Sequence, residues 1–282
     1  MSDTAPPVLA PPVLAPPVLA PPVLVVREGA VTWIRLNRPG VLNALDEPTA
    51  AAFLNACRSV ADEGGTGPTR VLVIAGNGRG FMAGGDVGRF NDNPAAAPAV
   101  AGAIIAHLHE ALRVLDRLDV PVLASVHGPV AGAGMSLASA ADLCIAADDA
   151  KFTMAYARIG ATPDGSGSFH LPRLVGLRRA MELAMLSDVI DTAEALRIGL
   201  VNRVVPAASL AEETAKLAAR LAAGPTVAYA GVRHLMRQSF DRTLEQQLDA
   251  ERDRFLTTAA TTDFAEGVGA FIAKRRPDFT GR

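Results

Sequence analysis

The chain has 282 residues, of which 50% are apolar and 20% are charged, and its formal net charge is −2 at pH 7. A chain of this length and composition can bury a sizeable core, which excludes a wholly disordered protein. Because there is no basic excess, we expect neither a nucleic-acid partner nor a membrane partner. Cys57 and Cys144 are too few for a disulfide framework and lack zinc-ligand spacing, so we expect buried thiols and no metal.

The N-terminal segment is a repeat, since residues 5–24 are four copies of Ala-Pro-Pro-Val-Leu. Paired prolines remove backbone donors and fix φ, which predicts a disordered or polyproline tail over residues 1–24. The start of the chain lacks a basic segment followed by an apolar core, and the uncharged run Val120–Ala141 contains two prolines. We therefore expect a cytoplasmic protein with no membrane span.

Residues 25–208 alternate between short apolar runs, which predict buried strands, and longer runs with helical periodicity. A hairpin is expected around Glu28-Gly29, and Asp46 is expected to cap the helix that follows it. Two strands are each followed by a glycine-rich turn and a helix, which predicts an α/β spiral or layered core. The expected strands are 23–27, 31–37, 70–75, 120–126, 143–147 and 151–153, and the expected helices are 46–62, 99–118 and one ending at residue 140.

The region from residue 209 to residue 282 has a helical pattern only. Its expected helices are 210–222, 226–240, 243–258 and 264–274. A helical region after an α/β core predicts a second small domain or an arm that is used for assembly.

Two glycine-rich turns stand out as candidate sites. Gly76–Gly88 contains six glycines, and Gly128–Gly134 follows the next buried strand. Glycines let the backbone approach a ligand, and the helix N-terminus after each turn offers free N–H groups. Two such turns that converge would suit a developing oxyanion, whereas tight turns in a packed core remain the alternative interpretation. The spacing of the glycines does not match the dinucleotide-binding pattern G-x-G-x-x-G.

Five segments resemble the crotonase, or enoyl-CoA hydratase/isomerase, superfamily. They occur in the family order, and the resemblance extends over about residues 24 to 280. The segments are Asn37–Leu45 (N-R-P and N-A-L), Phe81–Val87 (F-x-A-G-x-D), His127–Gly134, Ala195–Asn202 (A-L-x-x-G-L-V) and Phe264–Arg275.

This resemblance implies an α/β fold, the crotonase-type spiral of repeated ββα units, with a helical C-terminal region that forms a homotrimer or a dimer of trimers. It implies an acyl-CoA thioester as substrate, with coenzyme A as part of that substrate and no other cofactor. The N–H groups of Gly85 and Ala133 would hold the thioester oxygen. Coenzyme A would lie along Asn43, Ala83, Gly84, Asp86 and Val87. In the first of these segments, Asn37–Leu45, the family often has a lysine where this chain has Gly40.

The reaction depends on the bases near this oxyanion hole, because two donors on the oxygen stabilise an enolate but do not move protons. Family hydratases use two glutamates, and the matching positions here are Ser136 and Tyr156, neither of which is an anion at pH 7. Asp164 follows Tyr156 by eight residues, in a segment similar to the I-P-D-x-G-G of some family isomerases. From spacing alone, Asp164 would be a turn residue or a helix cap. With the resemblance, we expect it to be the catalytic acid and base of an enoyl-CoA isomerase.

Other roles stay open. Ser136, Tyr156 and His170 are candidates for the acyl pocket, Asp86 is expected to cap the helix after the first turn, and no role is expected for His109. The alternative activity is that of an enoyl-CoA hydratase, which would use Asp164 alone or a water held by Tyr156. Thioester hydrolysis and decarboxylation rank lower. The alternative of another class is a non-catalytic acyl-CoA binder.

Overall fold

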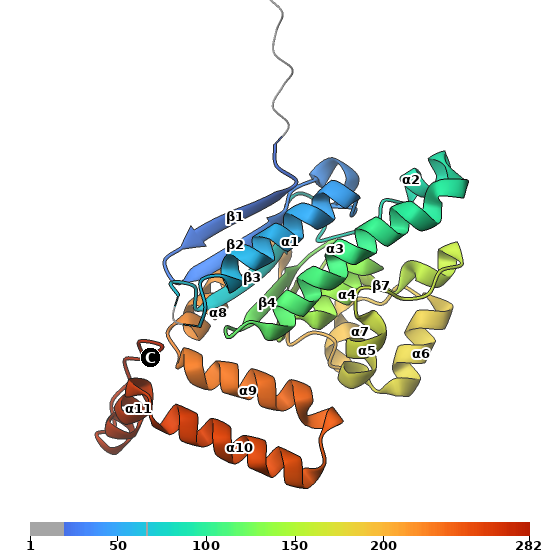
Figure 1. Ribbon diagram of the computed structural model, residues 1–282. Helices are drawn as coiled ribbons and strands as arrows, with labels where there is room; N and C mark the ends of the chain where they lie inside the picture. The colour runs from blue at the N-terminus through green and yellow to red at the C-terminus, as the bar shows by residue number, and fades with distance from the viewer. Residues whose placement is uncertain (1–19, 66) are drawn as a thin grey trace, which may run out of the picture.

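The computed structural model describes residues 20–65 and 67–282. Its centre is a six-stranded sheet in the order β1-β2-β3-β4-β6-β8, in which only β1 runs antiparallel to its neighbour (Figure 1). A second sheet pairs β5 with β7 in parallel. The strands are β1 Val23–Glu28, β2 Val31–Leu36, β3 Val71–Gly76, β4 Val122–Val126, β5 Pro129–Ala131, β6 Leu143–Ala147, β7 Lys151–Thr153 and β8 Arg203–Val205.

The predicted hairpin is confirmed, because β1 and β2 pair in register from Val23 opposite Leu36 to Glu28 opposite Val31. The predicted tail lies outside the described residues up to residue 19. The predicted C-terminal limit of the tail, residue 24, is wrong, because Val23 and Leu24 form the start of β1. The repeat therefore ends inside the fold, because its final Val-Leu pair follows the last proline and has free backbone donors.

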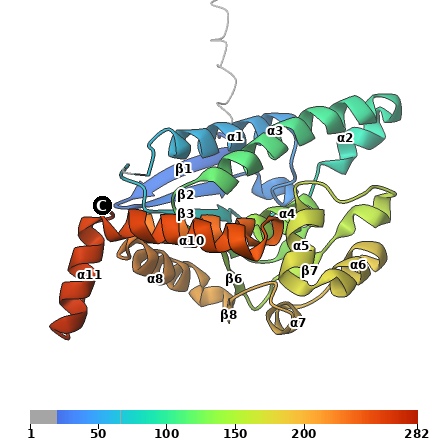
Figure 2. The ribbon, with the colours of Figure 1, turned by 60° about the horizontal axis from the view of Figure 1, so that its bottom comes forward.

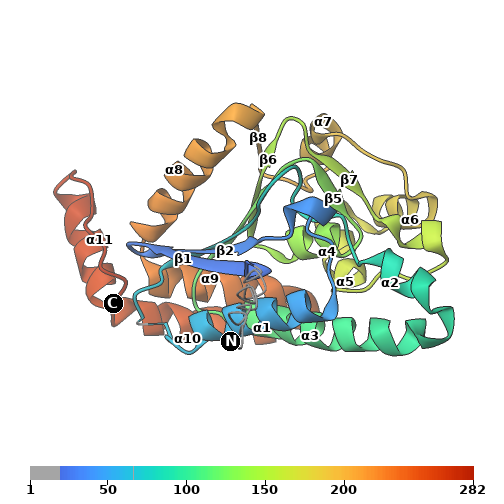
Figure 3. The ribbon, with the colours of Figure 1, turned by 90° about the horizontal axis from the view of Figure 1, so that it is seen from above.

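Helices cover both faces of the large sheet, as Figure 3 shows: α1 and α3 on one side and α8 on the other. Asp46 caps α1 as predicted, since its carboxylate accepts a hydrogen bond from the Thr49 N–H at 3.0 Å. The helices are α1 Glu47–Ala61, α2 Val87–Asp92, α3 Ala97–Arg117, α4 Ala133–Ala140, α5 Gly167–Val175, α6 Leu177–Leu186, α7 Thr192–Arg197, α8 Leu210–Ala222, α9 Thr226–Gln238, α10 Leu244–Ala259 and α11 Thr262–Ile272. Short 3-10 turns occupy Pro39–Val41, Pro94–Ala96, Ala155–Ile159, Ala207–Ser209 and Ser239–Asp241.

The core has two parts, one on each face of the sheet. The larger contains the buried side chains of α1 and α3, such as Phe53, Leu108 and Leu112, together with both cysteines, which are free and buried as expected. The smaller places Leu217 and Ala218 of α8 against the opposite face. Pro94–Arg117 is long and apolar enough to count as a candidate membrane span, yet the buried side chains of α3 pack in this core.

The region between β7 and residue 209 was not predicted in detail. The structure places three helices, α5, α6 and α7, and the edge strand β8 there. Pro172 lies inside α5 and glycines flank it, which hides a helix from pattern analysis because both residue types are typical of breaks.

We call α9–α11 the C-terminal arm. Helices α9 and α10 lie side by side below the core in Figure 1, and α11 points away at their end (Figures 1 and 2). Within this chain α10 buries none of its residues. The four predicted C-terminal helices are all present, although α8 belongs with the sheet rather than with the arm.

Candidate active site

The two glycine-rich turns meet at one edge of the sheet. They follow β3 and β4, which are parallel neighbours, so their carboxyl ends lie side by side. Main-chain hydrogen bonds join the turns: the Met82 N–H donates to Pro129 O at 3.2 Å, and the Ala131 N–H donates to Met82 O at 2.9 Å. The turns therefore form a single unit although they are far apart in the sequence.

Two glycines allow this close approach. Gly84 has φ of +102° and Gly132 has φ of +50°, in the region that side chains disfavour. A Cβ on Gly84 would stand 3.2 Å from Ala131 O, and a Cβ on Gly132 would stand 3.7 Å from the Gly84 Cα. A side chain at either position would strain the backbone, and at position 84 it would also crowd the Ala131 carbonyl of the other turn.

The N–H groups of Gly85 and Ala133 are unused in the described part of the chain. Leu45 donates its N–H to Gly84 O at 2.8 Å and accepts the Asp86 N–H at 3.0 Å, so this bridge turns the N–H of Gly85 to the opposite side. Ala133 is the first residue of α4, where an N–H has no partner within the helix. These are the two donors that the resemblance assigned to an oxyanion hole.

A buried polar cluster lies beside the second turn. Ser136 projects from α4, and its Oγ lies 3.2 Å from the hydroxyl of Tyr156. The Tyr156 hydroxyl also donates a short hydrogen bond to Oδ1 of Asp164. A Cβ on Gly132 would stand 3.9 Å from Cζ of Tyr156, which places the phenol ring next to the turn. The structure thus brings together Ser136, Tyr156 and Asp164, three of the predicted residues.

Tyr156 acts as a donor in this cluster. Its burial, together with the adjacent Asp164 carboxylate, raises the pKa of the phenol well above its usual range. The hydroxyl therefore keeps its proton at neutral pH and donates it in a hydrogen bond to Oδ1 of Asp164, with the main-chain oxygen of the same residue as a longer partner at 3.4 Å. Asp164 is partly exposed, and its other carboxylate oxygen, Oδ2, receives no hydrogen bond from the described residues.

His109 of α3 is a residue that sequence analysis missed. Its Nε2 accepts a hydrogen bond from the N–H of Gly165 at 3.2 Å, directly after Asp164 in the chain. No sequence signal marked this contact, because the two residues are 56 positions apart.

The structure bears on two expectations for the first turn, and the Asp86 cap is wrong. The Asn43 side chain is fully buried, with its amide nitrogen 2.9 Å from Gly80 O and 3.1 Å from Phe81 O, so it holds the turn, and its contact with coenzyme A stays a prediction. Asp86 stands at the N-terminus of α2, but its side chain does not cap the helix. Instead its carboxylate lies 3.6 Å from the Arg38 guanidinium, which is a stronger partner than a neutral N–H.

The predicted ligand-binding residues Ala83, Gly84 and Val87 lie along the first turn and the start of α2, where Val87 is half exposed. His170 does not join the cluster. It lines a cavity of about 410 Å³ between α5 and α9, together with Phe169 and Arg237, and neither Tyr156 nor Asp164 lines that cavity.

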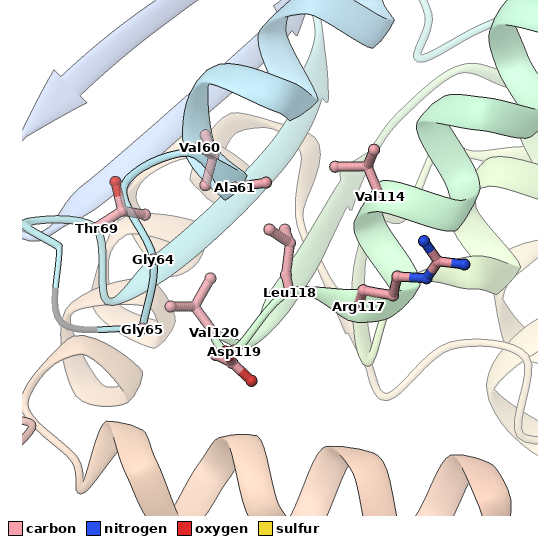
Figure 4. A pocket seen from close by; sticks show the side chains of 10 residues that line it. All are labelled: Val60, Ala61, Gly64, Gly65, Thr69, Val114, Arg117, Leu118, Asp119 and Val120. Carbon is pink, nitrogen blue, oxygen red and sulfur yellow. The ribbon is translucent and has the colours of Figure 1, made fainter.

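A smaller cavity, of about 170 Å³, lies where the ends of α1 and α3 meet the chain before β4 (Figure 4). Its walls are mostly apolar, with Val60, Val114 and Leu118 facing one another. It shares no residue with the polar cluster, so it is not the candidate active site.

Sequence comparison finds relatives that match nearly the whole chain. A 1,2-epoxyphenylacetyl-CoA isomerase of Escherichia coli K12 is 36% identical over 258 residues, which cover 91% of this chain and 97% of the relative. A probable enoyl-CoA hydratase of Rhodobacter capsulatus is 38% identical, over 88% of this chain and 94% of the relative. A trans-2-decenoyl-[acyl-carrier-protein] isomerase of Streptococcus mutans is 34% identical, over 90% and 96%.

Solved structures show the same fold. A putative enoyl-CoA hydratase/isomerase from Mycobacterium abscessus has a TM-score of 0.85 at 36% identity, over 92% of this chain and 100% of its own. An enoyl-CoA hydratase from Polaromonas sp. JS666 has a TM-score of 0.85 at 34% identity, over 91% and 99%. Residues 26–282 match the family model described as enoyl-CoA hydratase/isomerase. With the paired turns and this match over nearly the whole chain, the protein belongs to the enoyl-CoA hydratase/isomerase family, the crotonase superfamily.

Proposed function

We propose that this enzyme moves the double bond of an enoyl-CoA thioester from the 3-position to the 2-position. The observation that carries the proposal is the lone carboxylate of the cluster. Ser136 and Tyr156 are not ionised at neutral pH, so neither can act as a carboxylate base. Asp164 is the carboxylate of the cluster, with Oδ1 bonded to the Tyr156 hydroxyl and Oδ2 free of hydrogen bonds from the described residues.

The N–H groups of Gly85 and Ala133 bind the thioester oxygen. As the C2 proton leaves, negative charge develops on that oxygen, and each preorganised donor stabilises the transition state by about 3–4 kcal/mol. The N-terminus of α4 adds the partial positive charge of the helix end. The two turns therefore make the C2 proton acidic enough for a carboxylate to remove.

Asp164 accepts the proton from C2 through its free oxygen, which leaves a dienolate with its charge on the thioester oxygen. The protonated carboxyl then returns the same proton to C4, and the double bond forms between C2 and C3. No water enters and no other group is consumed, so one carboxyl group suffices. Two of the relatives are named isomerases, one of a 1,2-epoxyphenylacetyl-CoA and one of a trans-2-decenoyl-[acyl-carrier-protein], and the second name, which describes an enoyl substrate, supports this type of chemistry.

Hydration of 2-enoyl-CoA is the second candidate, because other relatives are named probable enoyl-CoA hydratase and crotonyl-CoA hydratase. It would require one carboxylate to activate water and also to protonate C2. Steady-state assays with 2-enoyl-CoA, 3-enoyl-CoA and dienoyl-CoA esters distinguish the two activities. Thermal stabilisation by acyl-CoA without any turnover would instead indicate a non-catalytic binder.

The critical variant is Asp164→Asn, which keeps the shape of the side chain but removes the base. We expect turnover of 3-enoyl-CoA to fall by roughly 10²–10⁴-fold, the range for a lost general base, while the Kd of a saturated acyl-CoA changes little. Asp188→Asn is the matched control, since Asp188 is exposed and lies outside the cluster. Turnover of Asp164→Asn at the wild-type rate would refute the role of Asp164.

We also propose that the chain assembles as a homotrimer or a dimer of trimers through the C-terminal arm. The support is the apolar surface of the arm, because large side chains of α10 and α11 are exposed in the single chain. They are Leu244, Leu248, Phe255, Leu256, Val268, Phe271 and Ile272.

A further inference from the structure

The turn that carries Asp164 contains two consecutive residues with positive φ. Gly165 has φ of +55°, and the next residue, Ser166, has φ of +63° although it bears a side chain. A residue with a side chain in this region costs about 1–3 kcal/mol unless its surroundings impose the conformation. Something must therefore hold the turn in place.

The surroundings hold Gly165 from two sides. A Cβ on Gly165 would stand 3.2 Å from Cδ2 of Leu108 on α3 and 3.3 Å from Cβ of Ser136 on α4, so the backbone is wedged between the two helices. The only side-chain acceptor for its N–H in the described structure is Nε2 of His109, the neighbour of Leu108. Among these contacts, the His109 bond is the directional one.

The His109 ring must be neutral to make this bond. An imidazole nitrogen accepts an N–H only when it carries no proton, so the ring proton lies on Nδ1. Because His109 has a fixed place on the long helix α3, the bond fixes the backbone at the residue that follows Asp164. Tyr156 fixes Oδ1 of the same aspartate.

We propose that His109 is a positioning residue for Asp164, an inference that rests on the proposed isomerase function. Nε2 of His109 and the hydroxyl of Tyr156 hold the base at two points, one on the following peptide N–H and one on the carboxylate. With both points held, the free oxygen of Asp164 keeps a single orientation, which the proposed proton transfer requires.

The test uses three variants of His109 in the full-length enzyme. His109→Gln keeps an acceptor at about the same reach, His109→Asn keeps the acceptor but is too short, and His109→Leu removes it. We expect kcat for 3-enoyl-CoA to fall roughly 10–10²-fold in His109→Asn and His109→Leu, as for a base that is slightly misplaced, with KM changed by less than about threefold. His109→Gln should stay within about threefold of wild type. His107→Leu, on the same helix, is the matched control.

A second measurement separates this proposal from the proposed function. Hydrogen–deuterium exchange of the peptide that spans residues 160–171 reports whether the turn is held, whatever reaction the enzyme performs. We expect faster exchange in His109→Asn and His109→Leu but not in His109→Gln. If turnover or exchange in His109→Leu equals that of wild type, or if His109→Gln is as impaired as His109→Leu, the positioning role is overturned. Failure of the isomerase proposal would appear instead in Asp164→Asn.

Discussion

The core and the C-terminal arm are held by different interactions. In the core, parallel strands and apolar side chains bury one another, and the two glycine-rich turns are joined by main-chain hydrogen bonds. In the arm, α9 is attached through arginine side chains, and α10 buries nothing within the chain. The core therefore contains the interactions that place the reactive groups, whereas the arm leaves apolar surface that only another chain or a ligand would cover.

Arg233 is the main link between the two regions. It is 5% exposed, and its guanidinium donates to the carbonyls of Leu115 at 2.7 Å and Leu118 at 2.5 Å, at the C-terminal end of α3. Its Nε donates to Asp142 at 2.5 Å. One side chain thus donates to the carbonyls at the end of a core helix, which lack full partners within the helix, and also pairs with a carboxylate. Arg237, one turn later, also pairs with Asp142, at 2.8 Å.

The largest loss of stability is expected for Arg233→Met, which removes the main link between the core and the C-terminal arm. It removes the Arg233 donor from the carbonyls of Leu115, Asp116 and Leu118 and deprives Asp142 of one partner, so the free energy of unfolding should fall by about 3–5 kcal/mol. Denaturant unfolding measures it. Arg252→Met is the control, because Arg252 on α10 makes only exposed ion pairs and its loss should hardly change the unfolding midpoint. Equal losses in the two variants would mean that the arm is not anchored through Arg233.

Gly134→Ala addresses the core. A Cβ at this position would stand 2.3 Å from Met82 O, a contact that only a shift between the two turns can relieve. We expect a loss of about 1–3 kcal/mol in unfolding free energy, as in overpacked cores, and a fall in turnover because the Gly85 and Ala133 N–H groups move apart.

Gly102→Ala is the matched control for that variant, because a Cβ at Gly102 on α3 would meet nothing within 4 Å. The same substitution should there stabilise the protein by about 0.5–1 kcal/mol, the helix propensity difference. A neutral effect of Gly134→Ala on both stability and turnover would contradict the close packing of the turns.

The last effect, which appears only at acid pH, concerns His170, where α5 faces the arm. Burial and the nearby Arg237 guanidinium lower the pKa of His170 to about 4, from 6.5 in an exposed histidine. Below pH 6.5 the unfolded chain binds a proton that the folded protein does not, so the free energy of unfolding should decrease as the pH falls. The contribution of His170 to that loss is about 2 kcal/mol between pH 6.5 and pH 4, after allowance for its partial exposure.

His170→Gln should remove this part of the pH dependence. Urea unfolding of wild type and variant at pH 4.5, 5.5 and 7 measures the difference in unfolding free energy. This difference should change with pH between pH 4.5 and 5.5 and should level off toward pH 7. Parallel pH profiles over the whole range would show that His170 is accessible to protons in the folded state.

Much of the core could be predicted from the sequence. Strict runs of apolar residues marked β3, β4 and β6, the Asp46 cap marked the start of α1, and the glycine spacing marked both turns. These features are local, since a strand or a cap depends on residues within a few positions of one another. The family resemblance added the order of the segments, which the fold confirms.

Contacts between distant segments could not be predicted. The pairing of His109 with Gly165 joins residues 56 positions apart, and the Arg233 bond to Leu118 joins residues 115 apart. The same holds for Asn43, whose amide bonds Gly80 O, 37 positions further along the chain. By itself the sequence determined the strands and helices up to β7, the C-terminal helices and the two turns, because burial and backbone freedom are encoded locally, whereas α5, α6, α7 and β8 escaped it. Only the tertiary structure decided which side chains hold Asp164 and which hold the arm, because those partners meet only after the helices have packed on the sheet.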